Sequence, residues 1–367
     1  MKEGWTYKKL GEICDLYQPK TISSDMLVSD GDYLVYGANG IIGRYNQYNH
    51  EASEVLVTCR GATCGTINIS KPFSWINGNA MVVHPKSENL CKRYLVFALR
   101  GIDMSDVITG AAQPQITRQS LTPKKLPVPP LSEQQRIVSE LDLLSSIIEK
   151  KKAQLKEYDQ LAQSIFYDMF GDPVTNEKGW EVKRLGDEFE VSSGGTPSTK
   201  KSEYWDDGDI SWIGSNMCQN QILFKNDGKF ITKDGYEHSS AKMYKKGFVL
   251  VALVGATIGK VALLNFDTTT NQNIAGINVP SNKDFDPIFV FYLIQSLYCF
   301  FENIGDGKFK MANLSFVRSL PIIKPSYEFQ QSFASKIEAI ERQKALIQQS
   351  ITEAETLFNS RMDYYFN

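Results

Sequence analysis

The side chains best suited to catalysis or metal binding are scattered along this chain. Cys59 and Cys64 form the closest cysteine pair, with the spacing C-x4-C, and neither a second pair nor histidines follow at zinc-finger distances. His50, His84 and His238 lie far apart in the sequence and beside no obvious nucleophile. We therefore predict no metal site and no catalytic residue here. We expect the six cysteines to be reduced and mostly packed as small apolar side chains.

The stretch GATIGK, residues 255–260, has the composition of a phosphate-binding P-loop but not its spacing. A P-loop has four residues between its glycines and Ser or Thr after the lysine, whereas three residues intervene here and Val261 follows. The chain also lacks the G-x-G-x-x-G dinucleotide fingerprint and the H-E-x-x-H zinc motif. These patterns argue against an enzyme that binds nucleotides or uses zinc.

Glycine-rich polar loops are the remaining candidates for binding. They are YGANGIIGRY (residues 36–45), CRGATCG (59–65), SSGGTPSTKK (192–201) and GKFKMAN (307–313). Glycine lets a backbone approach a ligand closely, and Asn, Gln, Arg and Lys can reach base edges or phosphates. The alternative, that each loop is only a tight turn, remains open.

The elements that must position these loops occur twice. GWTYKKLGEICDL (residues 4–16) returns as GWEVKRLGDEFEV (179–191), and VLVTCRGATCGTINI (55–69) returns as VLVALVGATIGKVAL (249–263). LPVPPLSEQQRIV (126–138) then matches LPIIKPSYEFQQSF (320–333), in the same order. Each copy therefore consists of one globular part followed by one long helical segment.

The globular parts are predicted to mix strands and helices. Strand patterns occur in DYLVYG, VLVTCRG and GTINIS of the first copy, and in ISWIG, GFVLVAL and GKVALL of the second. Residues 90–102 and 287–304 are predicted helices. The expected fold class is α+β, with two similar mixed domains.

The helical segments carry apolar residues at alternating steps of four and three, which is the spacing of a coiled coil. The first seam is Ile137, Leu141, Leu144, Ile148, Lys151, Leu155, Tyr158, Ala162, Ile165 and Met169. The second is Phe333, Ile337, Ile340, Lys344, Ile347, Ile351, Ala354, Phe358, Arg361 and Tyr365. Lys151 and Lys344 are expected either to fix the register or to extend their ammonium groups to water.

A narrow apolar seam needs a partner helix, and the other copy in the same chain can supply it. The connectivity predicts an antiparallel intramolecular coiled coil, with the two globular parts related by a pseudo-twofold axis. At 1.5 Å per residue, a helix over residues 132–170 is roughly 60 Å long, so we interpret it as a spacer.

Composition indicates a globular protein without a membrane span or leader. The chain has 367 residues, 42% of them hydrophobic and 22% charged, with a formal net charge of −2. Its most apolar run, residues 287–301, is too short to cross a bilayer. No charged, apolar leader opens the sequence, so we expect a cytoplasmic location.

The duplicated motifs resemble those of a known family. SGGTPSTKKSEYWDDGDISWIG, GATIGK, YGANGIIG and above all LPVPPLSEQQRIV, followed by a long helix, are similar to the specificity (S) subunit of type I restriction-modification systems. The resemblance covers nearly the whole chain. The second copy departs from the usual pattern with PSYEFQQSF, which leaves the start of its helix open.

The resemblance implies two target-recognition domains, at residues 1–130 and 173–320, and two helical spacers, at 131–172 and 321–367. Each domain is expected to read one half of a gapped, asymmetric sequence in double-stranded DNA. The helices are expected to dock methyltransferase (M) subunits, two per chain, and restriction (R) subunits complete the complex. S-adenosylmethionine, ATP and magnesium are expected on these partners, with no cofactor, no metal and no catalysis on this chain.

Base-reading residues are predicted in both domains from the polar loops, because Arg suits guanine and Asn or Gln suits adenine. The first domain offers Arg44, Tyr45, Arg60, Gln113, Gln115 and Arg118. The second offers Thr196, Ser198, Lys200, Lys201, Lys260, Lys308, Lys310 and Asn313.

Charge favours only modest DNA binding by this chain alone. Residues 1–130 carry 14 basic and 11 acidic side chains, a net of +3, and residues 171–320 carry 16 and 18, a net of −2. We hypothesise that partner chains supply much of the salt-dependent affinity for DNA.

Two other functions are alternatives to that of a DNA-reading subunit. One is a fused methyltransferase, for which no cofactor domain is found, and the other is a coiled-coil scaffold that binds other proteins.

Overall fold

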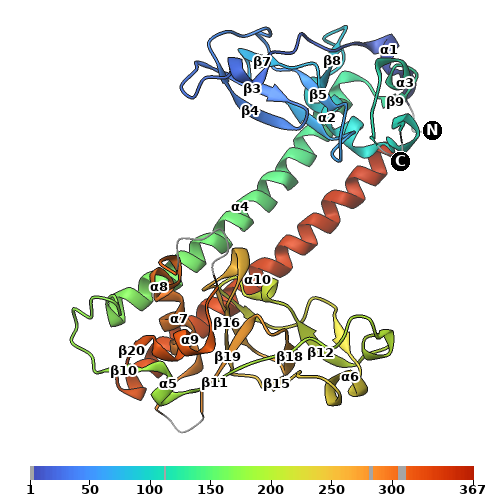
Figure 1. Cartoon of the computed structure of the whole chain (residues 1–367). Coiled ribbons are helices and arrows are strands. Elements are labelled where there is room, and N and C mark those ends of the chain that lie inside the picture. The colour runs from blue at the N-terminus through green and yellow to red at the C-terminus, as the bar shows by residue number, and fades with distance from the viewer. Residues whose placement is uncertain (1–3, 111–112, 281–283, 305–310) are drawn as a thin grey trace. The chain divides into compact units, whose positions relative to one another are not determined.

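The computed structural model describes residues 4–110, 113–280, 284–304 and 311–367, which form two compact units (Figure 1). Unit 1 comprises Met1–Ala153 and Gln348–Asn367, and unit 2 comprises Gln154–Ile347. Each unit combines β-sheets, short helices and parts of the two long helices, α4 (Leu131–Phe170) and α10 (Tyr327–Phe366). The predicted α+β class is confirmed.

Unit 1 contains a four-stranded antiparallel sheet in the order β2-β8-β5-β6 and a three-stranded sheet in the order β4-β3-β7, in which β3 and β7 are parallel. A third sheet pairs β1 with β9. The strands are β1 (Thr6–Lys9), β2 (Cys14–Tyr17), β3 (Tyr33–Gly37), β4 (Gly40–Tyr45), β5 (Val55–Thr58), β6 (Ile67–Ile69), β7 (Ser74–Ile76), β8 (Ala80–Pro85) and β9 (Lys125–Val128). The shorter helices are α1 (Leu10–Ile13), α2 (Lys92–Gly101) and α3 (Arg118–Leu121).

Unit 2 contains a five-stranded sheet in the order β11-β19-β16-β17-β13, a four-stranded sheet in the order β14-β12-β18-β15, and the pair β10-β20. Its strands are β10 (Val182–Arg184), β11 (Glu190–Ser193), β12 (Ile210–Ile213), β13 (Gln221–Leu223), β14 (Phe230–Ile231), β15 (Met243–Tyr244), β16 (Val249–Ala252), β17 (Val261–Leu264), β18 (Thr268–Thr270), β19 (Ile274–Asn278) and β20 (Pro321–Ile323). Its helices are α5 (Leu185–Glu188), α6 (Lys233–Glu237), α7 (Pro287–Ser296), α8 (Tyr298–Glu302) and α9 (Leu314–Ser319).

All residues of β5 are buried, which shows that this strand lies at the centre of unit 1. Successive side chains of a strand point to opposite faces. Val55 and Val57 accordingly join the core beneath α2, while Leu56 joins a smaller core with Tyr36 and Ile76. The unbroken apolar run VLV is therefore the signature of a strand covered on both faces.

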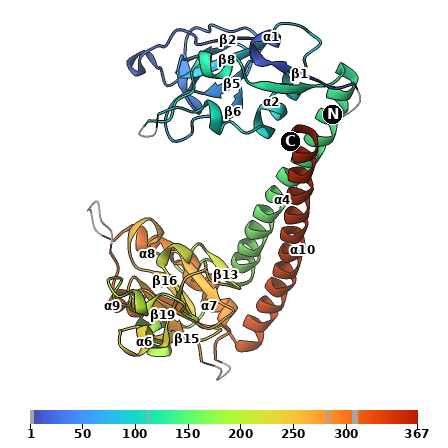
Figure 2. The ribbon, with the colours of Figure 1, turned by 90° about the vertical axis from the view of Figure 1, so that its right-hand side faces the viewer.

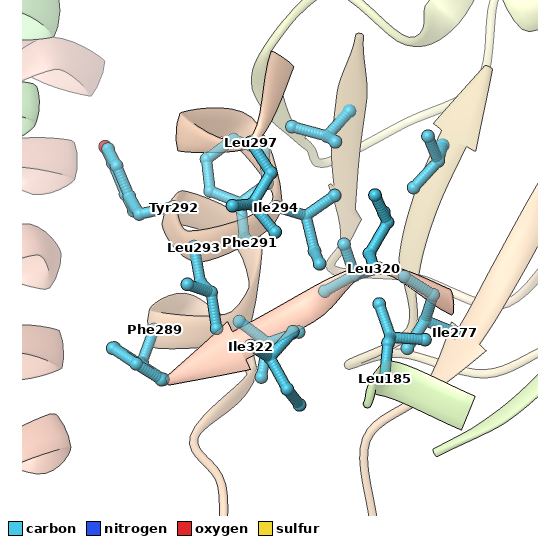
Figure 3. Packing of buried hydrophobic residues seen from close by; sticks show 14 of the residues in the cluster. Leu185, Ile277, Phe289, Phe291, Tyr292, Leu293, Ile294, Leu297, Leu320 and Ile322 are labelled. Carbon is cyan, nitrogen blue, oxygen red and sulfur yellow. The ribbon is translucent and has the colours of Figure 1, made fainter. Parts of the chain in front are cut away.

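Unit 2 repeats this arrangement around β16. Val249 and Val251 join the core beneath α7, and Leu250 and Ala252 join the core on the other face. Figure 3 shows the α7 side chains Leu293 and Ile294 packed beside residues of β20 and of the sheet. The similar order of elements in both units confirms the internal repeat that the sequence predicts.

The helix predicted over residues 287–304 is two helices. The chain leaves α7 at Leu297, whose backbone N–H donates to the carbonyl of Ile294, and α8 begins at Tyr298. Leu297 and Phe301 are both fully buried. Leu297 and Phe301 lie in the same core, so the apolar run continues through the break between α7 and α8.

The two long helices pair antiparallel within each unit. In unit 1 the first turns of α4 lie beside the last turns of α10, where Arg361 donates hydrogen bonds to Glu140 (Figure 2). In unit 2 the last turns of α4 lie beside the first turns of α10, where the rings of Phe166 and Phe333 meet edge to face at 5.6 Å. The predicted antiparallel intramolecular pairing is confirmed.

The seam positions lie at this helix interface. All twenty are buried or half-buried, with Ile137, Leu141 and Ile337 fully inaccessible. Lys344 is 23% exposed and forms 2.7 Å ion pairs with Asp159 of α4 and Glu341 of its own helix. Lys151 forms no ion pair with any residue that the structure describes.

The start of α10 matches that of α4 despite the different sequence before it. Gln134 is the fourth residue of α4, and Gln330 is the fourth residue of α10.

No helix among the described residues is long and apolar enough to cross a membrane.

Candidate nucleic-acid interface

The loop between β5 and β6 in unit 1 presents Arg60 on a tight glycine-bounded turn. Gly61 has φ +87° with open space where a side chain would stand, so its left-handed backbone, not crowding, favours glycine. The Cys64 N–H donates to the Gly61 carbonyl at 3.0 Å, and the Gly65 N–H donates to Thr58 at 2.9 Å. The loop is therefore held by its own backbone, and the Arg60 side chain is exposed.

A second segment, residues 113–116, runs antiparallel beside this loop. Arg60 and Gln115 form an isolated β-bridge, the Gly61 N–H donates to Pro114 at 3.1 Å, and the Ile116 N–H donates to Cys59 at 2.9 Å. Gln113 and Gln115 are exposed. The structure thus brings three of the predicted base-reading residues to one place, although Arg60 is more than fifty positions from the two glutamines in sequence.

Arg118 follows directly as the first residue of α3. Thr117 caps this helix by accepting a 3.1 Å hydrogen bond from the Ser120 N–H. Within the described part of the chain, neither Arg60 nor Arg118 forms an ion pair with a carboxylate. Both guanidinium groups can therefore meet phosphates or bases.

Unit 2 builds the same arrangement between β16 and β17. Gly255 has φ +73° with open space around it, and the Gly259 N–H donates to Ala252 at 2.8 Å. Val254 bridges to Met311, which is 68% exposed. Repetition of the loop and its neighbouring segment makes these two places the candidate interface, one in each unit.

Two predicted residues of unit 2 have side chains already engaged in the fold. Lys260 donates a 2.8 Å hydrogen bond to Gln219. Asn313 caps α9 by accepting a 2.8 Å hydrogen bond from the Phe316 N–H. Their roles in base reading remain predictions, as do those of Lys308 and Lys310, which lie outside the described residues.

A third segment, which was not predicted from the sequence, joins each interface. The Cys59 N–H donates to the carbonyl of Asn79 at 3.1 Å, and the Leu253 N–H donates to Asn273 at 2.8 Å. These asparagines end the motif N-x-N, at residues 77–79 and 271–273, just before β8 and β19. Its recurrence at the same place in both copies was the signal that could have identified it.

The loop after β11, which holds Thr196, Ser198, Lys200 and Lys201, is tied to this third segment. Thr196 donates to Gln272 at 2.7 Å. A side-chain carbon on Gly194 would lie 2.2 Å from the Thr270 carbonyl. This glycine is therefore required for packing of the loop against β18, so it does not by itself indicate a ligand.

Lys201 is held within its own loop, since its ammonium group donates to the Tyr204 hydroxyl at 2.8 Å. Ser198 contributes its backbone carbonyl, which accepts a 3.2 Å hydrogen bond from the Trp205 indole N–H. Their neighbour Lys200 is exposed and has no ion-pair partner in the described segments. Of the two lysines, Lys200 is the freer to meet a phosphate.

Arg44 and Tyr45 lie on β4, in a different sheet from the Arg60 loop. The Arg44 guanidinium donates to the backbone carbonyls of Gly31 and Asp32. The Tyr45 ring meets Trp75 edge to face at 5.5 Å. Both side chains support the local fold, and the structure does not bring them to the Arg60 loop.

The described residues contain no group of three or more His, Cys, Asp or Glu that could hold a metal ion. Burial raises the pKa of Cys59 to about 11 and that of Cys14 to about 12. These two thiols therefore stay protonated near neutral pH, in a form that is a poor nucleophile.

Residues 2–157 and 177–356 match the family described as the type I restriction modification DNA specificity domain. The chain belongs to this family. One matched segment falls in each copy of the repeat, which agrees with the duplicated interface of this specificity-domain protein.

Relatives of this specificity-domain protein are specificity subunits of type I restriction enzymes. The type I restriction enzyme MjaIX specificity subunit of Methanocaldococcus jannaschii is 31% identical over 161 residues, which are 43% of this chain and 37% of that protein. The EcoR124I/EcoR124II specificity subunit of Escherichia coli is 28% identical over 166 residues, 42% of this chain and 40% of that protein. The matched part thus spans well under half of each relative.

A solved structure shares the fold. The crystal structure of a type I restriction-modification system S subunit from M. genitalium superposes with a TM-score of 0.61 at 14% identity, over 99% of this chain and 96% of that one. At this identity the similarity shows that the fold is shared.

Proposed function

We propose that this chain is the DNA target-recognition subunit of a type I restriction-modification complex. In this proposal each recognition domain reads one half of a gapped, asymmetric sequence in double-stranded DNA. The observation that carries it is the duplicated loop cluster, because each copy sets a rigid glycine turn beside a second backbone segment, and in unit 1 this turn and segment expose Arg60, Gln113 and Gln115. Different residues on the same scaffold suit two different half-sites.

The proposed reading residues differ between the units in chemistry. Arg60, Gln113 and Gln115 offer guanidinium and amide groups, which suit guanine and adenine edges in the major groove. Lys200 and Lys260 in unit 2 are better suited to phosphate contacts, since a lysine is a point charge without a planar fork. Sequence reading in unit 2 is then left to groups such as Thr196 and Asn313.

Catalysis is proposed to reside on other chains of the complex. Methyltransferase subunits would modify adenine with S-adenosylmethionine, and restriction subunits would use ATP and magnesium. The family resemblance and the absence of P-loop and dinucleotide motifs in the sequence support this division. The near-neutral charge of both globular parts supports a further part of the proposal, that partner chains contribute much of the affinity for DNA.

The test is a genome-wide map of methylated adenines in cells that express this chain with its methyltransferase subunit. Cells lacking only this chain are the control. We expect a gapped two-part motif that disappears with the chain. An unchanged map, with an active methyltransferase present, would instead favour a scaffold that binds other proteins. Because the proposed ligand is cellular DNA, a cytoplasmic location is part of the proposal.

A further inference from the structure

The base of each long helix contains a buried glutamine with the same three partners. Gln134 and Gln330 are both 0% exposed. In unit 1, Gln134 accepts a hydrogen bond from the Cys91 N–H at 2.9 Å and donates to the carbonyls of Asn89 at 3.0 Å and Pro129 at 2.9 Å. One side-chain amide therefore joins the long helix, the loop that enters α2 and the linker that follows β9.

The glutamine of unit 2 makes the equivalent contacts. Gln330 accepts from the Asp286 N–H at 2.9 Å and donates to the carbonyls of Asp284 at 3.1 Å and Pro325 at 2.9 Å. The partners occupy matching places, at the entry to α7 and in the linker that follows β20. We call these two glutamines, each with its three backbone partners, the helix-base latches.

Other contacts at the helix bases differ between the units. In unit 1 the Tyr94 hydroxyl donates to Pro127, and Arg93 pairs with Asp142. In unit 2 a phenylalanine, Phe289, stands at the place of Tyr94, and the Asp286 side chain caps α7. The helix-base latches are thus a directional polar contact that both units share.

A buried amide differs from the surrounding apolar contacts in what it fixes. Apolar packing is non-directional, whereas an amide with three satisfied hydrogen bonds holds its partners at set distances and angles. Breaking it would leave buried backbone groups without partners, which is costly. Each latch therefore fixes the direction in which a long helix leaves its recognition domain.

Small changes in that direction matter because the helices are long. A 40-residue helix measures roughly 60 Å, so a tilt of about 5° at its base moves its far end by roughly 5 Å. This exceeds the rise of about 3.4 Å per base pair of DNA.

We propose that Gln134 and Gln330 are positioning residues that restrict the range of gap lengths accepted between the two half-sites. The proposal rests on the proposed function, because it concerns the spacing of a two-part target. In it the glutamines contact no DNA, and they act by restricting the angle between recognition domain and helix. They determine how strictly one gap length is preferred, and they do not determine which bases are read.

The chain offers a matched control beside each latch. Gln135 and Gln331 are the next residues along the same helices, and both are exposed. The test compares Gln134→Met and Gln330→Met with Gln135→Met and Gln331→Met, each in the full chain with its methyltransferase subunit. Substrates are duplexes with both half-sites of the mapped motif, at the original gap and at one base pair more or less.

We expect the latch variants to raise methylation at the altered gaps relative to the original gap by about tenfold, the equivalent of one lost hydrogen bond. The bases preferred within each half-site should stay the same, and the controls should match the unaltered chain. Equal loss of methylation at all gap lengths, or an unchanged gap preference in a folded variant, would overturn the proposal.

A milder variant covers the case in which methionine prevents folding. Gln134→Asn keeps the amide but is one methylene shorter, so it cannot reach all three backbone partners at once, and it should broaden gap preference in the same direction. If this variant also keeps the original gap preference, the proposal is wrong. Failure of the proposed function is recognised separately, because the unaltered chain would then yield no gapped motif.

Discussion

Arg60 is the residue on which direct base recognition by unit 1 can be tested most cleanly. Its side chain is exposed on a turn held by backbone hydrogen bonds, so its removal should leave the fold intact. We expect Arg60→Ala to reduce discrimination at one base pair of one half-site by about 1–3 kcal/mol. Methylation of duplexes with each base at each position measures this.

The comparison for Arg60 is Lys200→Ala. A lysine that contacts phosphate should weaken methylation of all sequences about equally and reduce the dependence of DNA binding on salt. If Arg60→Ala instead weakens methylation of all sequences about equally, Arg60 contacts the DNA backbone and not a base.

The stability that Glu140 gives to the helix pairing of unit 1 depends on pH. The hydrogen bond from Arg361 lowers the pKa of Glu140 below its ordinary value of 4.5, against the opposing effect of burial, and the Tyr365 hydroxyl lowers it further. A carboxylate with a lowered pKa in the folded state stabilises that state above its unfolded pKa. This contribution is lost as pH falls through the lowered value.

We therefore expect Glu140→Gln to cost about 1 kcal/mol at neutral pH, which lowers the melting temperature by about 2–4 °C. The difference from the unaltered chain should shrink as the pH falls below 4.5. Thermal unfolding followed by circular dichroism over a pH series measures it. Glu149→Gln on the exposed face of α4 is the control, and an equal effect there would contradict the role of the Glu140 network.

Side chains that hold the fold together are difficult to distinguish by sequence from side chains that bind a ligand. Asn313 was predicted to contact adenine, and the structure shows a second role that its place before a helical stretch also favours, the N-cap of α9. Gln134 was missed, although the pair Gln-Gln recurs in both copies at residues 134–135 and 330–331, because glutamine in the first turn of a polar helix usually faces water. Only its burial by α2 and the linker, which depends on the tertiary fold, makes it a latch.

Among the elements, the α4–α10 pairing in unit 2 depends on an aromatic cluster. Phe166 packs against Phe170, Phe289, Tyr292 and Phe333, with ring centroids 5.2 to 6.3 Å apart. Phe166 is 1% exposed. We expect Phe166→Ala to destabilise unit 2 by about 3–5 kcal/mol, the usual range for a large side chain removed from a core.

The matched control for Phe166 is Leu161→Ala on the same helix, because Leu161 is 47% exposed and should cost well under 1 kcal/mol. Urea unfolding followed by the fluorescence of Trp180, which packs against Phe170, reports on this end of unit 2 in chains whose other four tryptophans are replaced by Phe. Similar midpoints for both variants would show that the aromatic cluster contributes little to helix pairing.

Elements with strong periodicity were predictable, and elements defined by partners were not. The seam and the strands VLV were evident because each reflects a simple spacing of apolar side chains. The turn at Leu297 was missed because the apolar run continues through it. The parallel pairing of β3 with β7 was likewise beyond prediction, since it joins segments separated by three other strands.

At the scale of the whole molecule, the length of the two helices should set the size of the gap in the target. Inserting seven residues after Ala153 in α4, and seven after Ile347 in α10, preserves the seam spacing and adds roughly 10 Å. We expect the gap methylated best to lengthen by up to about three base pairs.

Methylation of a gap series with the lengthened chain and its methyltransferase subunit measures this shift. An insertion of seven residues into α4 alone is the control, because it breaks the match between the helices and should impair methylation at every gap. An unchanged gap in the doubly lengthened chain would show that the helices do not determine spacing.

Unit 1 is assembled from the two extremes of the sequence, since Met362, Tyr365 and Phe366 complete the core formed with Tyr94 and Phe97. About 195 residues separate the two parts of this unit. At 5–20 residues per second, the ribosome needs roughly 10–40 s to make that stretch. During synthesis, residues 4–153 of unit 1 therefore precede residues 348–367, and until those are made the core around Tyr94 and Phe97 lacks Met362, Tyr365 and Phe366.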